Sequence, residues 1–198
     1  MNNKNLKWIV IGGIIVVLFL WIMSSYNGLV GRDVEVQKAW SNVETQYQRR
    51  SDLIVNIVKI AMKASKVENK ILTDVIAARN NANSVKIDPS KLTEEQLNKY
   101  AMAQNQVKSS FNVVVEQYPD LKSIPQFAKI QDEIAGTENR VGTARKDFND
   151  VVADYNKSIR SFPGNVFAGI FGFTQKSAFK ADEGTEKAPN LDELLDKE

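Results

Sequence analysis

Residues 8–23 read WIVIGGIIVVLFLWIM, sixteen residues without a charge. At about 1.5 Å per helical residue this run covers roughly 24 Å, somewhat less than the ~30 Å hydrocarbon core of a bilayer. Trp8 and Trp21 flank the run and Tyr26 follows it, and aromatic rings prefer the level of the lipid headgroups. We therefore predict one transmembrane helix over residues 8–25, with these three aromatic residues as its anchors.

The flanks of this run distinguish a permanent anchor from a cleaved signal peptide. No Ala-x-Ala-like pair lies near residues 23–26, and the chain has no Cys for a lipoprotein anchor, so the sequence favours a retained helix. Residues 1–7 form a short basic N-terminus, and Arg32 and Lys38 follow the run, so the positive charges nearly balance. Because the α-amino group adds one charge at the N-terminal side, we expect a single-pass protein of the bacterial cytoplasmic (inner) membrane with its bundle domain outside.

The composition excludes several classes of function. Lys and Arg number 26 against 24 Asp and Glu, and the resulting formal charge of +2 gives no field for nucleic acid. The chain has no His and no Cys, so the usual zinc ligands, thiol nucleophiles and imidazole bases are missing. We predict no enzyme, no catalytic residue, no metal site and no cofactor. The expected partners are the lipid bilayer, further copies of the chain, and other membrane or envelope proteins.

The sequence after the span predicts long helices. Neither Gly nor Pro occurs between Gly31 and Pro89, and residues 80–89 collect turn formers. Apolar residues recur there in steps of four and three, which is the heptad pattern of packed helices. The stripe comprises Val36, Trp40, Val43, Tyr47, Ile54, Ile57, Ala61, Ala64, Ile71 and Val75.

Cap and turn signals divide the rest of the chain. Thr93 and Gln96 have capping-box spacing and open a helix that ends before Pro119, and a last long helix begins at Pro125. The predicted fold class is all-α. It comprises a single N-terminal transmembrane helix followed by an antiparallel up-and-down four-helix bundle over residues 26–162.

Residues 26–82 could hold one helix or two. A single helix from Gly31 to Ala82 would be about 80 Å long at ~1.5 Å per residue, far longer than the later helices. A reversal near residues 65–66 gives two helices and sets Glu138 opposite Arg50, whereas an unbroken helix would bring Glu138 nearer to Glu68. Because the first pairing is attractive and the second repulsive, we favour two helices.

Five polar residues fall on the apolar stripes and are called here the polar seam: Arg50, Glu68, Gln131, Glu138 and Arg145. Our main interpretation is an internal layer of ion pairs and hydrogen bonds that fixes helix register, because an unpaired buried ion costs several kcal/mol. Alternatives are a seam that faces a partner subunit and, remotely, an acid/base enzyme that uses inward carboxylates. If Glu138 is buried and depends on Arg50, Arg50→Met should cost about 3–5 kcal/mol.

Two segments follow the bundle. An even number of helices returns the chain to the membrane end, so the Phe-rich segment 163–180 should lie near the bilayer. Short apolar tails more often complete a core, which favours a cap over interfacial docking with its usual Lys/Arg-rich face. Residues 181–198 are acidic and predict a flexible tail. The membrane-proximal aromatic residues are Phe162, Phe167, Phe171 and Phe173.

A set of short motifs runs along nearly the whole chain. They include Ala39-Trp40, Asp52-Leu53-Ile54, Ala77-Ala78-Arg79, Tyr118-Pro119-Asp120-Leu121-Lys122, Thr137-Glu138-Asn139-Arg140, Asp147-Phe148-Asn149, Tyr155-Asn156 and Phe162-Pro163. In combination they resemble the LemA family of bacterial membrane proteins. That resemblance implies one N-terminal span and an all-helical domain, and it supplies no settled biochemical activity. Val55 replaces the family's usual Pro, and Val67 replaces its His, so metal binding there is disfavoured.

These features favour a non-enzymatic, membrane-anchored helical scaffold or oligomer-forming envelope protein of the LemA type. The motivating features are the apolar run, the heptads and the lack of reactive side chains. The alternative is a regulatory or sensing subunit for a neighbouring membrane enzyme, which would act through the acidic tail.

Overall fold

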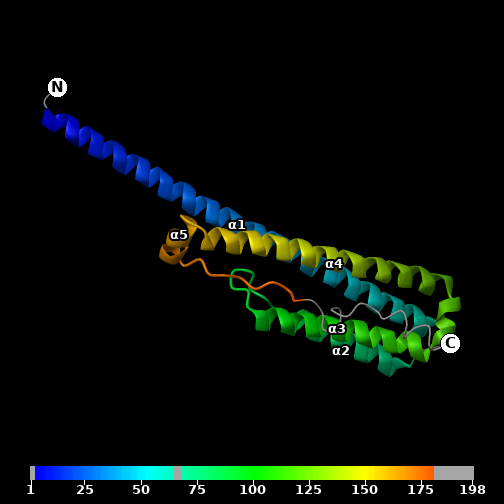
Figure 1. The fold of residues 1–198 in the computed structure, drawn as a ribbon. Coiled ribbons are helices and arrows are strands. Elements are labelled where there is room, and N and C mark those ends of the chain that lie inside the picture. The colour runs from blue at the N-terminus through cyan, green and yellow to red at the C-terminus, as the bar shows by residue number, and fades with distance from the viewer. Residues whose placement is uncertain (1–2, 65–67, 181–198) are drawn as a thin grey trace, which may run out of the picture.

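A computed structural model describes residues 3–64 and 68–180, so the predicted flexible tail lies outside the described residues. All regular structure in this part of the chain is helical, and the predicted all-α class is confirmed (Figure 1). The elements are α1 (Asn3–Lys63), α2 (Asn69–Ser84), α3 (Glu94–Gln117), the 3-10 helix η1 (Pro119–Ser123), α4 (Pro125–Arg160) and α5 (Gly164–Phe171).

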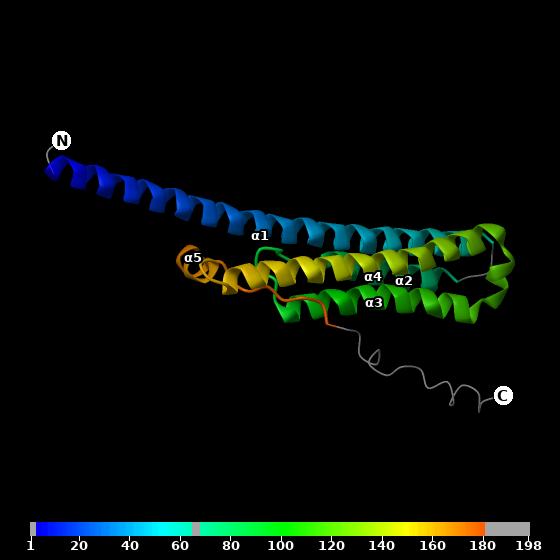
Figure 2. The same cartoon turned by 45° about the horizontal axis from the view of Figure 1, so that its top comes forward.

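The bundle has the predicted up-and-down order. α1 ends at Lys63 and α2 begins at Asn69, so two helices occupy the stretch for which we weighed one or two. The second half of α1 packs along α4, and α2 and α3 form an antiparallel pair on their other side (Figures 1 and 2). Turn formers at residues 80–84 belong to α2, which ends at Ser84, two residues beyond the predicted end of the helical stretch at residue 82.

The predicted span and the first bundle helix are one helix. α1 continues through Gly28 and Gly31, and its N-terminal half projects beyond the bundle (Figure 2). Residues 8–23 are exposed, whereas burial begins at Leu29 and continues at Val36 and Trp40. A Gly inside a helix destabilises it by about 1 kcal/mol relative to Ala. We attribute the continuity of α1 to the burial of Leu29, Val36 and Trp40 in the bundle, which offsets this cost.

The core consists of two apolar clusters along the bundle. The cluster near the projecting helix surrounds Trp40, and the distal one surrounds Ile54 and Phe127. On α4 the buried positions include Thr137 and Ala144, not the next residues Glu138 and Arg145 that the stripe predicts. Small residues let α1 and α4 approach closely, and the long charged side chains lie at the edge of the contact.

The capping box that the sequence predicts at the start of α3 is formed. The Thr93 hydroxyl accepts a hydrogen bond from the Gln96 amide at 3.3 Å, and the Thr93 amide donates to Gln96 Oε1 at 3.1 Å. Thr93→Ala should therefore lower the free energy of unfolding by about 1 kcal/mol. Urea unfolding followed by circular dichroism measures this loss, and an unchanged midpoint would contradict the assignment.

Candidate functional site

Arg50 is the centre of a polar layer that joins three helices. Its side chain is 2% exposed, and Nη1 donates to Glu138 Oε1 of α4 at 2.9 Å. Nη2 donates to the Gln104 carbonyl of α3 at 2.8 Å, and the guanidinium lies 4.9 Å from the centre of the Tyr47 ring. Lys108 Nζ reaches the other Glu138 oxygen at 3.2 Å. The structure thus contains the Arg50–Glu138 pair that the predicted reversal near residues 65–66 sets opposite each other. The polar layer links α1, α3 and α4.

The other members of the polar seam lie elsewhere. Glu68 is exposed at the start of α2, and Gln131 is half-buried on α4. Arg145 lies 4.8 Å from the Phe179 ring and donates to the Lys180 carbonyl at 3.1 Å. Arg50 lies about 20 Å along α1 from Lys63, near which α2 begins, at 1.5 Å per residue. The structure therefore does not bring Glu68 together with Glu138 as an acid/base pair.

Residues 173–180, called here the strap, run back from α5 along the bundle as an extended segment (Figure 2). Asn156 Nδ2 donates to the Lys176 carbonyl at 2.8 Å, and its Oδ1 accepts from the Lys176 amide at 2.9 Å. Asn149 makes the same two bonds to Phe179, both at 2.9 Å. Two asparagines seven residues apart on α4 thus hold the strap's backbone.

Lys176 fixes the strap to two further elements. Its side chain is 1% exposed, and Nζ lies 2.6 Å from Asp33 Oδ1 of α1. Nζ also donates to the Pro89 carbonyl at 2.7 Å, and the Ser177 amide donates to the Leu92 carbonyl at 3.1 Å. A buried ammonium requires such partners, because an unpaired buried charge is strongly unfavourable.

Phe179 carries the strap into the core. Its ring stacks on Trp40 at a centroid distance of 6.0 Å and meets the edge of Phe148 at 5.5 Å. The sequence patterns did not single out Asp33 or Lys176, and Asn149 and Asn156 appeared only within the family motifs, without a role. The available signal was the pair of asparagines at heptad spacing beside the apolar stripe of α4.

Tyr155 adds a pH dependence to the strap contact. Its hydroxyl donates to the Thr174 carbonyl at 3.0 Å, and burial, with the Asp33 carboxylate second, raises its pKa to about 12. The phenol of an unfolded chain ionises near pH 10, so the unfolded state loses its proton first and stability falls as pH rises from about 10 to 12. Tyr155→Phe should make that fall shallower in urea unfolding across this range, and an unchanged slope would exclude Tyr155 as its source.

The short helix α5 packs where α1 leaves the bundle (Figure 1). Phe167 is buried and meets the Trp21 ring edge-on at 5.3 Å, and Phe171 meets Tyr26 at 4.8 Å. Gly164 allows α5 to fold back on α4, since a Cβ there would clash with the Ser158 carbonyl oxygen. Of the predicted membrane-proximal residues, Phe167 is buried, Phe173 half-buried, and Phe162 and Phe171 exposed. The predicted anchor residues Trp8, Trp21 and Tyr26 are all exposed.

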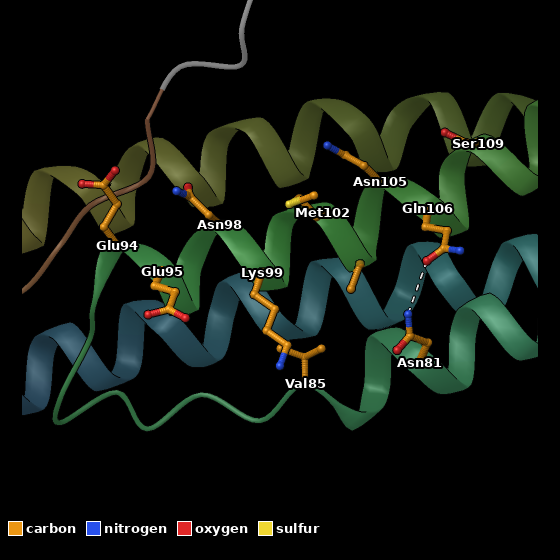
Figure 3. A pocket seen from close by; sticks show the side chains of 11 residues that line it. Asn81, Val85, Glu94, Glu95, Asn98, Lys99, Met102, Asn105, Gln106 and Ser109 are labelled. Carbon is orange, nitrogen blue, oxygen red and sulfur yellow. Dashed lines mark hydrogen bonds between the residues drawn. The ribbon is translucent and has the colours of Figure 1, made fainter.

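An open groove of about 1070 Å³ lies between α2 and α3 (Figure 3). Asn81 donates to Gln106 Oε1 at 3.3 Å across it, and Met102 is exposed on α3 within the groove. Small-ligand sites are usually enclosed, whereas this groove is open to solvent along its length. Among the described residues, no three Asp or Glu side chains gather in a group that could hold a metal ion.

The fold and these contacts define a helical-bundle protein built on one long helix, the only described helix that is long and apolar enough to cross a membrane. The chain belongs to the LemA family, whose model matches residues 39–192. The resemblance of the sequence motifs is thereby confirmed.

Curated relatives are similar over most of the chain. Magnetosome protein MamQ 2 of Paramagnetospirillum magneticum is 28% identical, covering 84% of this chain and 68% of the relative. Magnetosome protein MamQ of Magnetospirillum gryphiswaldense is 26% identical, with 80% and 65% covered. Protein LemA of Metamycoplasma hominis is 22% identical, with 79% and 69% covered. None of these names is that of an enzyme.

Proposed function

We propose that this LemA-family chain is a non-enzymatic, membrane-anchored scaffold, a single-pass protein of the bacterial cytoplasmic membrane with its bundle outside. The observation that carries the proposal is the continuity of α1, in which the exposed apolar run and the buried core residues share one helix. A bundle that shares a helix with its anchor is held close to the bilayer. Its outer surfaces are then available to further copies or other envelope proteins.

The groove between α2 and α3 is the surface we assign to self-association. α2 and α3 lie on the side of the bundle away from the α1–α4 contact, and Met102 and Val113 are exposed on α3. The exposed surface of the groove is mostly apolar and polar side chains rim it, which is the pattern of many protein contacts. Met102 is a suitable position for a crosslink because it is exposed within the groove. The chain has no native Cys, so a cysteine placed there would be the only one.

The size of the full chain in mild detergent tests the scaffold. We expect a species larger than a monomer, with disulfide crosslinking of Met102→Cys between chains. Lys146→Cys, exposed on α4, is the matched control and should crosslink much less. A strictly monomeric chain without crosslinked partners would overturn the proposal.

The side of the membrane needs a separate measurement. Protease added to sealed cells should degrade the bundle if it lies outside, and it should do so before the cells are opened. A bundle that becomes sensitive only after lysis would place the domain in the cytoplasm and would contradict the proposed orientation.

A second candidate, a regulatory subunit acting through residues 181–198, is favoured by the strap. Residues 176 and 179 are fixed to α4, so the tail begins at a defined place on the bundle. Deleting Asp182 to Glu198 should abolish capture of a membrane enzyme in pull-downs from membranes, and unchanged capture would exclude this role.

A further inference from the structure

The outer face of α5 is apolar and exposed. Ile170 is 68% exposed and Phe162, just before α5, is 78% exposed, while Val166 and Phe171 are also on the surface. The chain carries no charged residue from Ser161 to Gln175. A cap over the bundle accounts for the buried Phe167, but it leaves these outward side chains without a role. A concentrated, uncharged apolar face of this kind marks a contact with another apolar phase.

This face is continuous with the apolar surface of α1. Phe167 touches Trp21 and Phe171 touches Tyr26, the two aromatic residues at the bundle end of the apolar run. Figures 1 and 2 both show α5 beside α1, at the point where α1 emerges from the bundle. The exposed residues of α5 therefore extend the apolar surface of α1 sideways.

The spacing along α1 gives the depth of α5. A hydrocarbon core of ~30 Å spans about 20 helical residues, which is the separation of Lys7 and Asn27. With the core placed between these two residues, Tyr26 lies about 1.5 Å and Trp21 about 9 Å inside its bundle-side boundary. Because α5 contacts both aromatic residues, it lies in the outermost layer of the hydrocarbon, the depth at which interfacial helices bind.

We propose that α5 is a second membrane contact, which inserts its outer face into the acyl-chain and headgroup boundary beside the transmembrane part of α1. The proposal rests on the membrane anchorage proposed above. The strictly apolar run of α1 is about 24 Å long, so α5 supplies apolar surface where that run falls short of the bilayer thickness.

The composition of α5 indicates that it binds the apolar part of the bilayer rather than charged headgroups. Interfacial helices commonly attract anionic lipids through Lys and Arg, and α5 has neither. Its contact with lipid depends on apolar area, and α1 holds it at the bilayer at a high effective concentration. Docking therefore requires no anionic headgroup and is insensitive to salt.

Environment-sensitive probes on single cysteines test the docking. The full chain, which lacks native Cys, is labelled with NBD at Ile170→Cys and inserted into phosphatidylcholine nanodiscs. Ile15→Cys in the apolar run and Met102→Cys on α3 are the controls. Nitroxide-labelled lipid should quench the probe at residue 170 nearly as strongly as at residue 15, with a blue-shifted emission at both, and should leave residue 102 unaffected. Phosphatidylserine or 1 M salt should not change the result.

The controls separate failure of the docking from failure of the anchor. If residue 170 behaves like residue 102 while residue 15 is quenched, the anchor stands and the docking of α5 is excluded. If residue 170 is blue-shifted but not quenched by lipid, protein covers α5, and the membrane contact is again excluded. If residue 15 itself is not quenched, the proposed membrane anchorage fails. A probe at Val166→Cys, on the same exposed face, must reproduce the result at residue 170.

Discussion

Glu138→Ala is expected to lower the free energy of unfolding by about 3–5 kcal/mol, the largest effect of a single change in the polar layer. The substitution takes the carboxylate from Arg50, which is 2% exposed, and among the described residues leaves it the hydrogen bond to the Gln104 carbonyl. Arg50 Nε already has no hydrogen-bond partner within this part of the chain. Urea unfolding of the full chain in detergent, followed by circular dichroism, measures the loss.

The reciprocal change should cost much less. Arg50→Met replaces the buried guanidinium by an apolar side chain, and the Glu138 carboxylate that it leaves behind is 32% exposed and keeps Lys108. We expect a loss of about 1–2 kcal/mol, below the 3–5 kcal/mol that the sequence predicts for a buried Glu138. The two ends of the ion pair thus contribute unequally, because burial is concentrated at the arginine.

An exposed pair on the same helix provides the control. Lys146 and Asp150 are four residues apart on α4 and both largely exposed, so Asp150→Asn should change the free energy of unfolding by no more than about 0.5 kcal/mol. Equal losses for Arg50→Met and Glu138→Ala would show that the layer is not asymmetric. A loss for Glu138→Ala as small as that of Asp150→Asn would show that Arg50 is hydrated in solution.

Local chemistry explains which parts of the fold the sequence predicts. Pro125 begins α4 and Thr93 caps α3, because a missing amide or a hydroxyl acts within one turn of its own residue. The Arg50–Glu138 pair was predictable from two helix lengths and one reversal. The sequence placed the buried face of α4 one residue too late at Glu138 and Arg145. Their neighbours Thr137 and Ala144 have the same seven-residue spacing, and these small residues are the buried ones because they fit the closest contact.

The strap was not predictable from the same signals. An extended segment has no helical period, and its contacts join residues far apart in the chain, such as Asp33 with Lys176. Nothing in the sequence distinguishes Lys176 from a surface lysine, because its burial depends on a carboxylate of α1 and a carbonyl of the loop before α3. Glu68 was misplaced for a different reason: it directly follows the predicted reversal and precedes the first residue of α2, so the helical period of the stripe does not apply to it.

Asp33→Asn is the second change with a large expected effect, and its effect should be local. The substitution keeps the shape of the side chain and removes the charge that faces the Lys176 ammonium, which is 1% exposed. Breaking a buried ion pair costs about 3–5 kcal/mol if the charge stays buried. Here the strap can leave the bundle and hydrate Lys176, so the cost cannot exceed the free energy that holds the strap in place.

The variant should therefore open the strap while the four-helix bundle stays folded. The amides of Lys176, Ser177 and Phe179 are bonded to Asn156, Leu92 and Asn149, so their hydrogen exchange should accelerate on the order of 100-fold, with faster trypsin cleavage after Lys176. Exchange in the middle of α4 should not change. Asp150→Asn is the matched control, and Asp33→Asn combined with Lys176→Met should restore slow exchange because no unpaired charge remains. If the single variant instead destabilises α4 as much as the strap, the strap is part of the cooperative core and does not open separately.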